Sequence, residues 1–111
     1  MKKEDVISRF GLTKTQTKKI ERFVLEIFNF NKHTNIVGKS TLENVWERHI
    51  ADSLQLSLFI AKKKSKIFDL GSGGGLPGIP LSVLGYSNIY MVDSVGKKID
   101  FIRNIIKILS L

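Results

Sequence analysis

A glycine-rich segment directly after a short apolar stretch is the part of this chain best suited to chemistry with a small molecule. Ile67–Leu70 reads IFDL, and Gly71–Gly78 reads GSGGGLPG. Glycine has no Cβ, so a backbone of this composition turns tightly and approaches a ligand closely. In open α/β sheets, ligands bind beyond the carboxyl ends of the strands. The pattern predicts a strand that leads into a nucleotide-type pocket. The simpler alternative is a tight turn that binds no ligand.

The residues after the glycines argue against a phosphate-binding P-loop. Such a loop needs Lys-Ser or Lys-Thr after its last glycine, because the amine neutralises the phosphates and the hydroxyl binds magnesium. Here Gly78 is followed by Ile79 and Pro80. The P-loop interpretation therefore fails.

A dinucleotide-binding loop is a closer rival, since Gly73–Gly78 satisfies the G-x-G-x-x-G pattern. In that motif, however, the first glycine directly follows the strand, and the pyrophosphate lies on free N–H groups at the start of a helix. Counted from Gly71, the third small position falls on Leu76, and the next residue, Pro77, has no N–H to donate. The segment is therefore poorly suited to phosphate.

An acid lies at the end of a second apolar stretch. Ile89–Val92 is followed by Asp93, which comes 22 residues after Gly71. Nucleotide-binding α/β folds place near this distance the carboxylate that accepts hydrogen bonds from both ribose hydroxyls, and a carboxylate there disfavours a 2′-phosphate. An aspartate at a strand end is also a common turn or cap residue. The combination with the glycine segment is what predicts a ribose-binding role.

The chain is strongly basic, and the excess lies in its first part. It has 111 residues and a formal net charge of +8, and residues 1–66 hold 14 Lys and Arg against 7 Asp and Glu. A basic half joined to a nearly neutral half suggests a polyanion on the first and a small molecule on the second. A lysine run is also typical of a plain solvated surface. The candidate RNA contacts are Lys62, Lys63, Lys64, Lys66, Arg48 and His49.

Other features of the sequence exclude several classes of protein. The chain has no cysteine, which removes disulfides and thiolate sites, and we predict no metal centre. The first residues carry acids where a secretory signal needs an apolar core, and no run approaches the roughly 18 apolar residues of a membrane span. We therefore expect a cytoplasmic protein with no membrane partner.

The N-terminal part of the chain, which must help to position these residues, is predicted to be helical. Glu4–Phe10 is predicted to form a short helix that stops at Gly11. The Thr13-x-x-Gln16 pattern is typical of a capping box at the start of a longer helix. The spacing of its apolar residues predicts one buried face, formed by Ile20, Phe23, Val24, Ile27 and Phe28.

After a loop over 31–40, a third helix is predicted from near Thr41, with a break around 51–53. On or near its inner side we expect Leu42, Val45, Trp46, Ile50, Leu54 and Leu58. The pattern then changes to strands at 67–70 and 89–92, with a helix at about 79–84 between them and a last helix from about Ser94. The fold class is α/β: a basic helical N-terminal region over 1–65, and over 66–111 a β-α-β-α half of a parallel sheet.

The order Asp69-x-Gly71-x-Gly73-x-Gly75 resembles the first motif of the S-adenosylmethionine-dependent methyltransferases. Their cofactor carries an amino acid and a sulfonium in place of a pyrophosphate. By this resemblance, Asp69 attracts the ammonium group directly or through water, and the glycines let the methionine part lie against the backbone.

Three further motifs make the resemblance more specific. LPGIPL at 76–81, VDSxxKKxxFI at 92–102 and RHIxDS at 48–53, together with Asn35-Ile36, are similar to the ribosomal RNA small subunit methyltransferase G family, also called RsmG or glucose-inhibited division protein B. The resemblance implies a Rossmann-like fold and transfer of a methyl group from S-adenosyl-L-methionine to N7 of a guanine in small-subunit (16S) ribosomal RNA. It makes Gly71 and Leu76 cofactor contacts, surrounded by Asp69, Gly73, Gly75 and Asp93.

Members of that family continue about as far again beyond the position of Leu111, with strands and loops that contact the adenine and help to hold the guanine. We therefore expect this sequence to be the N-terminal half, with little activity alone. The partner is small-subunit RNA or the small ribosomal subunit, and no catalytic residue is assigned, because methyl transfer to a free ring nitrogen needs mainly positioning. The alternatives are a fragment of a nicotinamide-dependent oxidoreductase and a non-catalytic RNA-binding remnant.

Overall fold

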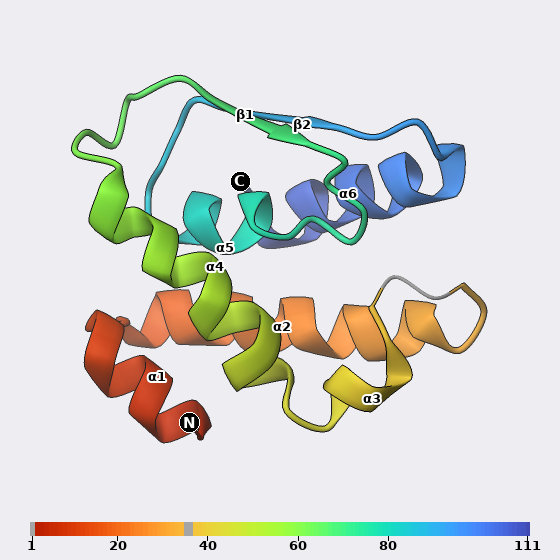
Figure 1. Ribbon diagram of the computed structural model, residues 1–111, viewed down its shortest axis with the longest axis horizontal. Coiled ribbons are helices and arrows are strands. Elements are labelled where there is room, and N and C mark those ends of the chain that lie inside the picture. The colour runs from red at the N-terminus through yellow and green to blue at the C-terminus, as the bar shows by residue number, and fades with distance from the viewer. Residues whose placement is uncertain (1, 35–36) are drawn as a thin grey trace.

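The computed structural model describes residues 2–34 and 37–111, which form a layer of helices on one side of a small parallel sheet (Figure 1). The first helices are α1 (Lys3–Phe10), α2 (Lys14–Asn31) and α3 (Lys39–Leu42). A continuous helical segment follows, made of the π-helix η1 (Trp46–Ala51), α4 (Asp52–Gln55) and the 3-10 helix η2 (Leu56–Phe59). The remaining elements are β1 (Ile67–Leu70), α5 (Gly78–Val83), β2 (Ile89–Val92) and α6 (Gly96–Leu109).

The boundary between α1 and α2 is set by the predicted cap residues. Gly11 follows α1 in the left-handed conformation, with a φ of 60°, which glycine adopts without strain. The Gln16 amide donates to Thr13 Oγ1 at 3.1 Å, and the Thr13 amide donates to Gln16 Oε1 at 3.0 Å. This reciprocal pair satisfies two amides that the start of α2 would otherwise leave free. The predicted capping box is confirmed.

The end of α2 differs from the prediction, since the helix includes Asn31. The buried Asn31 side chain explains the difference: its Nδ2 donates to the Val37 carbonyl at 3.0 Å, and the Val37 amide donates to its Oδ1 at 3.2 Å. A side chain that replaces backbone partners in this way stabilises the exit from a helix. The Asn35-Ile36 motif lies outside the described residues.

The predicted third helix is α3 followed by the segment η1–α4–η2, and around 51–53 its winding changes from π to α without a break. The prediction that Leu58 faces inward is wrong, since Leu58 is 69% exposed. A 3-10 helix advances by about 120° per residue instead of about 100°, so η2 turns Leu58 away from the face that holds Ile50 and Leu54. Phe28 is also 40% exposed, because it lies at the margin of the apolar stripe of α2.

One hydrophobic core joins the helical layer to the helices of the sheet. The Phe30 ring of α2 packs against the Phe101 ring of α6, with the ring centroids 4.8 Å apart. The core contains residues from before and after position 65, and its fully buried members include Ile20, Phe23, Ile50, Ile79 and Ile105. Because the core is close-packed, the N-terminal helices fix the position of α5 and of the glycine segment that leads into it.

β1 and β2 pair in parallel, with Ile67 opposite Ile89 and Leu70 opposite Val92, and α5 forms the crossover between them. All the helices lie on one side of the sheet (Figure 1). The other side presents the exposed side chains of Phe68, Leu70, Tyr90 and Val92. The predicted β-α-β-α half of a Rossmann-like sheet behind a helical region is confirmed.

Replacing Gly75 with alanine tests how tightly the glycine segment packs on α5. Gly75 has a φ of +87°, and a Cβ there would lie 2.5 Å from Cγ1 of the buried Ile79. We expect Gly75→Ala to lower the free energy of unfolding by about 1–3 kcal/mol, measured by urea denaturation, because the backbone and Ile79 must both shift. Gly96→Ala is the control, since a Cβ there would meet no atom within 4 Å. Equal losses for the two variants would contradict this packing.

Candidate functional site

The glycine segment leaves β1 through a loop in which alternate glycines take a conformation that other residues rarely adopt. Gly71, Gly73 and Gly75 have φ values of 70°, 54° and 87°. The Gly71 and Ser72 amides both donate to the Val92 carbonyl, at 2.7 and 3.0 Å, so the loop begins by crossing the end of β2. The three glycines that the motif requires are therefore the ones that shape the loop.

Asp69 lies beneath this loop. Its carboxylate is buried, and Oδ2 accepts a hydrogen bond from the Gly78 amide at the start of α5, at 3.0 Å. The Ser72 hydroxyl donates to the Asp69 carbonyl at 2.8 Å. Burial raises the pKa of the Asp69 carboxyl, and the hydrogen bond from the Gly78 amide opposes that rise. Asp69 therefore joins the two ends of the loop.

Asp93 meets the loop from the end of β2. Its Oδ2 accepts from the Gly73 amide at 2.8 Å, and its Oδ1 accepts from the Val95 amide at 2.8 Å. These two bonds, from Val95 and Gly73, lower the pKa of the Asp93 carboxyl. The ionised carboxylate of Asp93 therefore lies next to Gly73, at the carboxyl ends of both strands.

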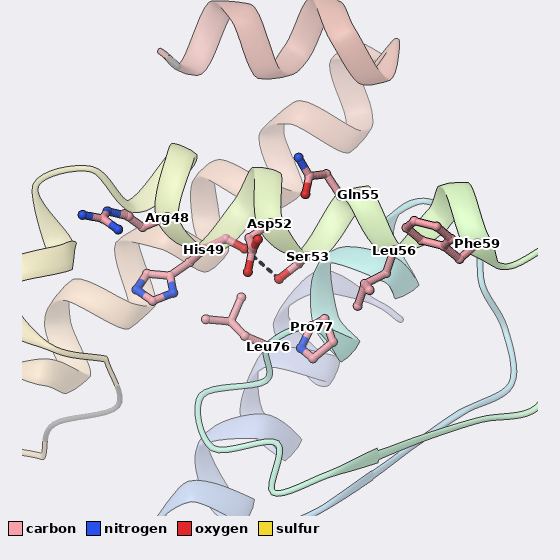
Figure 2. A pocket seen from close by; sticks show the side chains of 9 residues that line it. All are labelled: Arg48, His49, Asp52, Ser53, Gln55, Leu56, Phe59, Leu76 and Pro77. Atoms are coloured by element: carbon pink, nitrogen blue, oxygen red, sulfur yellow. Dashed lines mark hydrogen bonds between the residues drawn. The ribbon is translucent and has the colours of Figure 1, made fainter.

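The predicted cofactor contacts come together at this edge of the sheet. Asp69 and Asp93 each accept a hydrogen bond from an amide of the segment 71–78. Leu76 differs, because its side chain points toward the helical segment that carries α4 (Figure 2). The loop therefore has one side toward Asp93 and another toward the N-terminal helices.

Between the loop and those helices lies a cavity of about 300 Å³ (Figure 2). One wall is formed by Leu76 and Pro77, and the other by side chains of η1, α4 and η2, namely Arg48, His49, Asp52, Ser53, Gln55, Leu56 and Phe59. The sequence motif RHIxDS contains four of these residues, and in it Asp52 follows Arg48 at the i, i+4 spacing that suits an ion pair on a helix. The structure shows no ion pair between these two described residues. The spacing of apolar residues does not predict that Leu56 and Phe59 line the cavity, because the 3-10 winding of η2 brings them there.

His49 is held by its own helical layer. The distance between His49 Nε2 and Thr41 Oγ1 is 2.8 Å, and the Ser53 hydroxyl donates to the His49 carbonyl at 2.7 Å. Burial lowers the pKa of the His49 imidazole, the Asp52 charge opposes this, and the Arg48 charge adds to it. The lowered pKa disfavours the protonated ring, and Nε2 is engaged with Thr41. Arg48 is the exposed cation of this wall.

The lysine run lies at the other end of β1. Lys62, Lys63, Lys64 and Lys66 are exposed and precede the strand, whereas the glycine loop follows it. A four-residue strand separates the two ends by about 13 Å. Lys63 Nζ lies 4.3 Å from the Tyr86 ring centroid, and Lys66 Nζ lies 5.7 and 5.5 Å from those of Phe68 and Tyr90. The structure therefore does not bring the lysine run to the glycine loop.

Within residues 2–34 and 37–111, no cluster of three or more histidine or acidic side chains is placed to hold a metal ion. Over the same residues, no helix combines the length and apolar character that crossing a membrane requires.

The fold defines part of a Rossmann-like α/β domain, and comparison with known proteins specifies the family. The GidB family, described as rRNA small subunit methyltransferase G, matches residues 16–111. The chain belongs to this family.

Three relatives, each named ribosomal RNA small subunit methyltransferase G, illustrate the match. The protein of Rhodospirillum centenum is 34% identical over 94% of this chain and 48% of its own length. That of Magnetococcus marinus is 40% identical over 79% of this chain and 40% of its own length. That of Cereibacter sphaeroides is 32% identical over 93% of this chain and 52% of its own length. The chain spans about half the length of the curated relatives it matches.

The buried Asp69 carboxyl predicts a particular dependence of stability on pH. Its pKa is raised in the folded protein, so its contribution to stability is full at low pH and is lost as the pH rises from the pKa of the unfolded chain through that of the folded one. Asp69→Asn keeps an acceptor for the Gly78 amide but does not titrate. The unfolding free energy of this variant minus that of the wild type should therefore increase with pH through this window and then level off. Urea denaturation between about pH 3 and 7 measures it, and a constant difference would contradict the raised pKa.

Proposed function

We propose that this chain is the cofactor-binding half of an S-adenosylmethionine-dependent methyltransferase that acts on N7 of a guanine in the 16S RNA of the small ribosomal subunit. The observation that carries the proposal is the Asp93 carboxylate, which accepts a hydrogen bond from Gly73 where β1 and β2 end. Membership of the family supports the reaction class and the ribosomal substrate. A ribosomal substrate implies a cytoplasmic location.

The geometry around Asp93 fits the sugar of such a cofactor. Each Asp93 oxygen accepts one backbone hydrogen bond, which leaves lone pairs on both for the two hydroxyls of a ribose. The lowered pKa keeps this acceptor ionised. At Gly71, a Cβ would meet no atom within 4 Å, so the backbone there has space beside it for the methionine part of the cofactor.

The same geometry is unfavourable for a pyrophosphate. In dinucleotide-binding folds that group lies on the free amides at the start of the helix after the first strand. Here the Gly78 amide at the start of α5 already donates to Asp69, and Pro77 has no N–H. A buried carboxylate at this position also repels an anion. These observations favour S-adenosylmethionine over a nicotinamide dinucleotide.

Bound S-adenosylmethionine would supply an electrophilic methyl group on its sulfonium. Guanine N7 carries a lone pair and no proton, so the protein needs no strong base for this transfer. The task of Asp93, the loop glycines and Asp69 is to hold the cofactor in one orientation, and that of the substrate-binding side is to place N7 in line with the methyl group. Proximity and orientation of this kind account for a large part of many enzymatic rate increases.

Calorimetric titration tests the cofactor. We expect the chain to bind S-adenosylmethionine in preference to NAD, and Asp93→Ala to weaken that binding by at least about tenfold through loss of hydrogen bonds to a charged acceptor. Asp100→Ala on α6 is the matched control and should bind like the wild type. Binding of NAD alone would favour the oxidoreductase alternative, and an unchanged affinity in Asp93→Ala would remove that residue from the ribose role.

The exposed lysine run before β1 favours a second candidate, a non-catalytic RNA-binding protein that keeps this fold. Transfer of labelled methyl groups from S-adenosylmethionine to unmodified small ribosomal subunits separates the two functions. Incorporation above background excludes this second candidate. Binding of RNA without incorporation, by a chain that does bind the cofactor, favours it.

The lysine run gives a separate prediction about RNA. If Lys62, Lys63, Lys64 and Lys66 contact phosphates, RNA affinity should fall steeply with salt, and neutralising all four should reduce the slope of log affinity against log salt by up to about 3 for single-stranded RNA. Fluorescence anisotropy over a salt series measures the slope. An unchanged slope would show that this surface, at the far end of β1, is not the contact.

A further inference from the structure

The cavity between α4 and the glycine loop has the composition of a site for a single RNA base. Phe59 is 83% exposed and borders the cavity, so its ring is open to stacking on a base. Arg48 is exposed on the same wall and offers a guanidinium to a phosphate. Asp52 adds a carboxylate, which accepts hydrogen bonds and therefore suits the N–H donors on the edge of a base.

Asp52 is free to act as that acceptor. Its side chain extends from α4 toward the space above Leu76 and Pro77 (Figure 2). Among the residues that the structure describes, no cation forms an ion pair with it, and the neighbouring His49 is engaged with Thr41. The Asp52 charge acts on the His49 ring, but within residues 2–34 and 37–111 no hydrogen bond or ion pair occupies its carboxylate oxygens. An exposed carboxylate of this kind at the margin of a cavity is suited to a ligand that brings two donors.

Guanine is the RNA base that fits this carboxylate. Its Watson–Crick edge carries two adjacent donors, N1–H and the N2 amine, which match the two oxygens of a carboxylate. Adenine and cytosine place a ring-nitrogen acceptor at the centre of that edge, and uracil flanks its single donor with two acceptors. We infer that the cavity binds the target guanine and that Asp52 selects it by accepting hydrogen bonds from N1–H and the N2 amine.

This placement also leaves the reacting atom on the correct side. N7 lies on the opposite edge of the purine from N1 and N2. A guanine held on Asp52 therefore presents N7 away from α4, toward the wall formed by Leu76 and Pro77 (Figure 2). That wall is the end of the glycine loop, whose other side faces Asp93. The inference rests on the function proposed above and adds to it the residue that recognises the base.

Titration of the isotope-labelled chain with mononucleotides, followed by NMR, tests the inference. We expect GMP to shift the amide signals of Asp52, Phe59 and Leu76 and to bind at least about fivefold more tightly than AMP. Inosine monophosphate, which lacks only the N2 amine, should bind with intermediate affinity. Asp52→Asn should bring GMP and AMP to within about twofold of each other, because an amide presents one acceptor and one donor. Phe59→Ala should weaken both nucleotides by the same factor, since stacking does not discriminate between them.

Asp100→Asn makes the same chemical change on α6, away from the cavity, and should keep the preference for GMP. Equal affinities of the wild type for GMP and AMP, no binding of GMP, or an unchanged preference in Asp52→Asn would overturn the inference. Titration of the same samples with S-adenosylmethionine separates this from the proposed function. Cofactor binding without a GMP preference refutes only the role of Asp52, and a GMP preference that depends on Asp52 without cofactor binding refutes only the proposed cofactor.

Discussion

The hydrogen bond between the buried Asp69 carboxylate and the Gly78 amide is the contact on which the rest of the site depends. It joins the third residue of β1 to the first residue of α5, and the whole glycine segment lies between these two points. Gly78 has no room for a side chain, since a Cβ would lie 2.5 Å from Met91 Sδ and 3.0 Å from Asp69 Oδ2. The helix can therefore approach the strands closely only at a glycine, and the approach is fixed by a carboxylate that burial makes costly to ionise.

With both ends of the glycine segment fixed, the residues in its middle contact two different parts of the protein. On one side, the Gly73 amide meets Asp93 and sets the distance between the loop and the end of β2. On the other side, Leu76 and Pro77 close a cavity against the helical segment that carries Asp52. A small molecule bound on the first side and a base bound on the second would be separated only by the backbone of the loop. The N-terminal helices share a core with α5 and α6, so their packing sets the width of the cavity.

The sequence predicted what depends on local chemistry. The capping box at Thr13, the left-handed Gly11, both strands and the Asp93 position follow from short-range patterns, and the structure has them there. The cavity could not be predicted in the same way. It depends on changes of winding in η1 and η2, which rotate Phe59 and Leu58 away from an ideal helical periodicity, and on the distance between segments far apart in the chain. The hydrogen bonds between the buried Asn31 side chain and Val37 are local, but they depend on how the chain leaves α2, and the apolar spacing does not indicate them.

The bare side of the sheet has a consequence for how this fold can be enlarged. Phe68 and Tyr90 stack there with centroids 5.2 Å apart, beside Leu70 and Val92, and every helix lies on the opposite side (Figure 1). A new layer laid on this surface, or a new strand added beside β1 or β2, would bury apolar area without displacing any side chain of the existing core. The hydrophobic core lies entirely on the helical side of the sheet. Additions to the other side or to the edges would therefore leave the packing of this core unchanged.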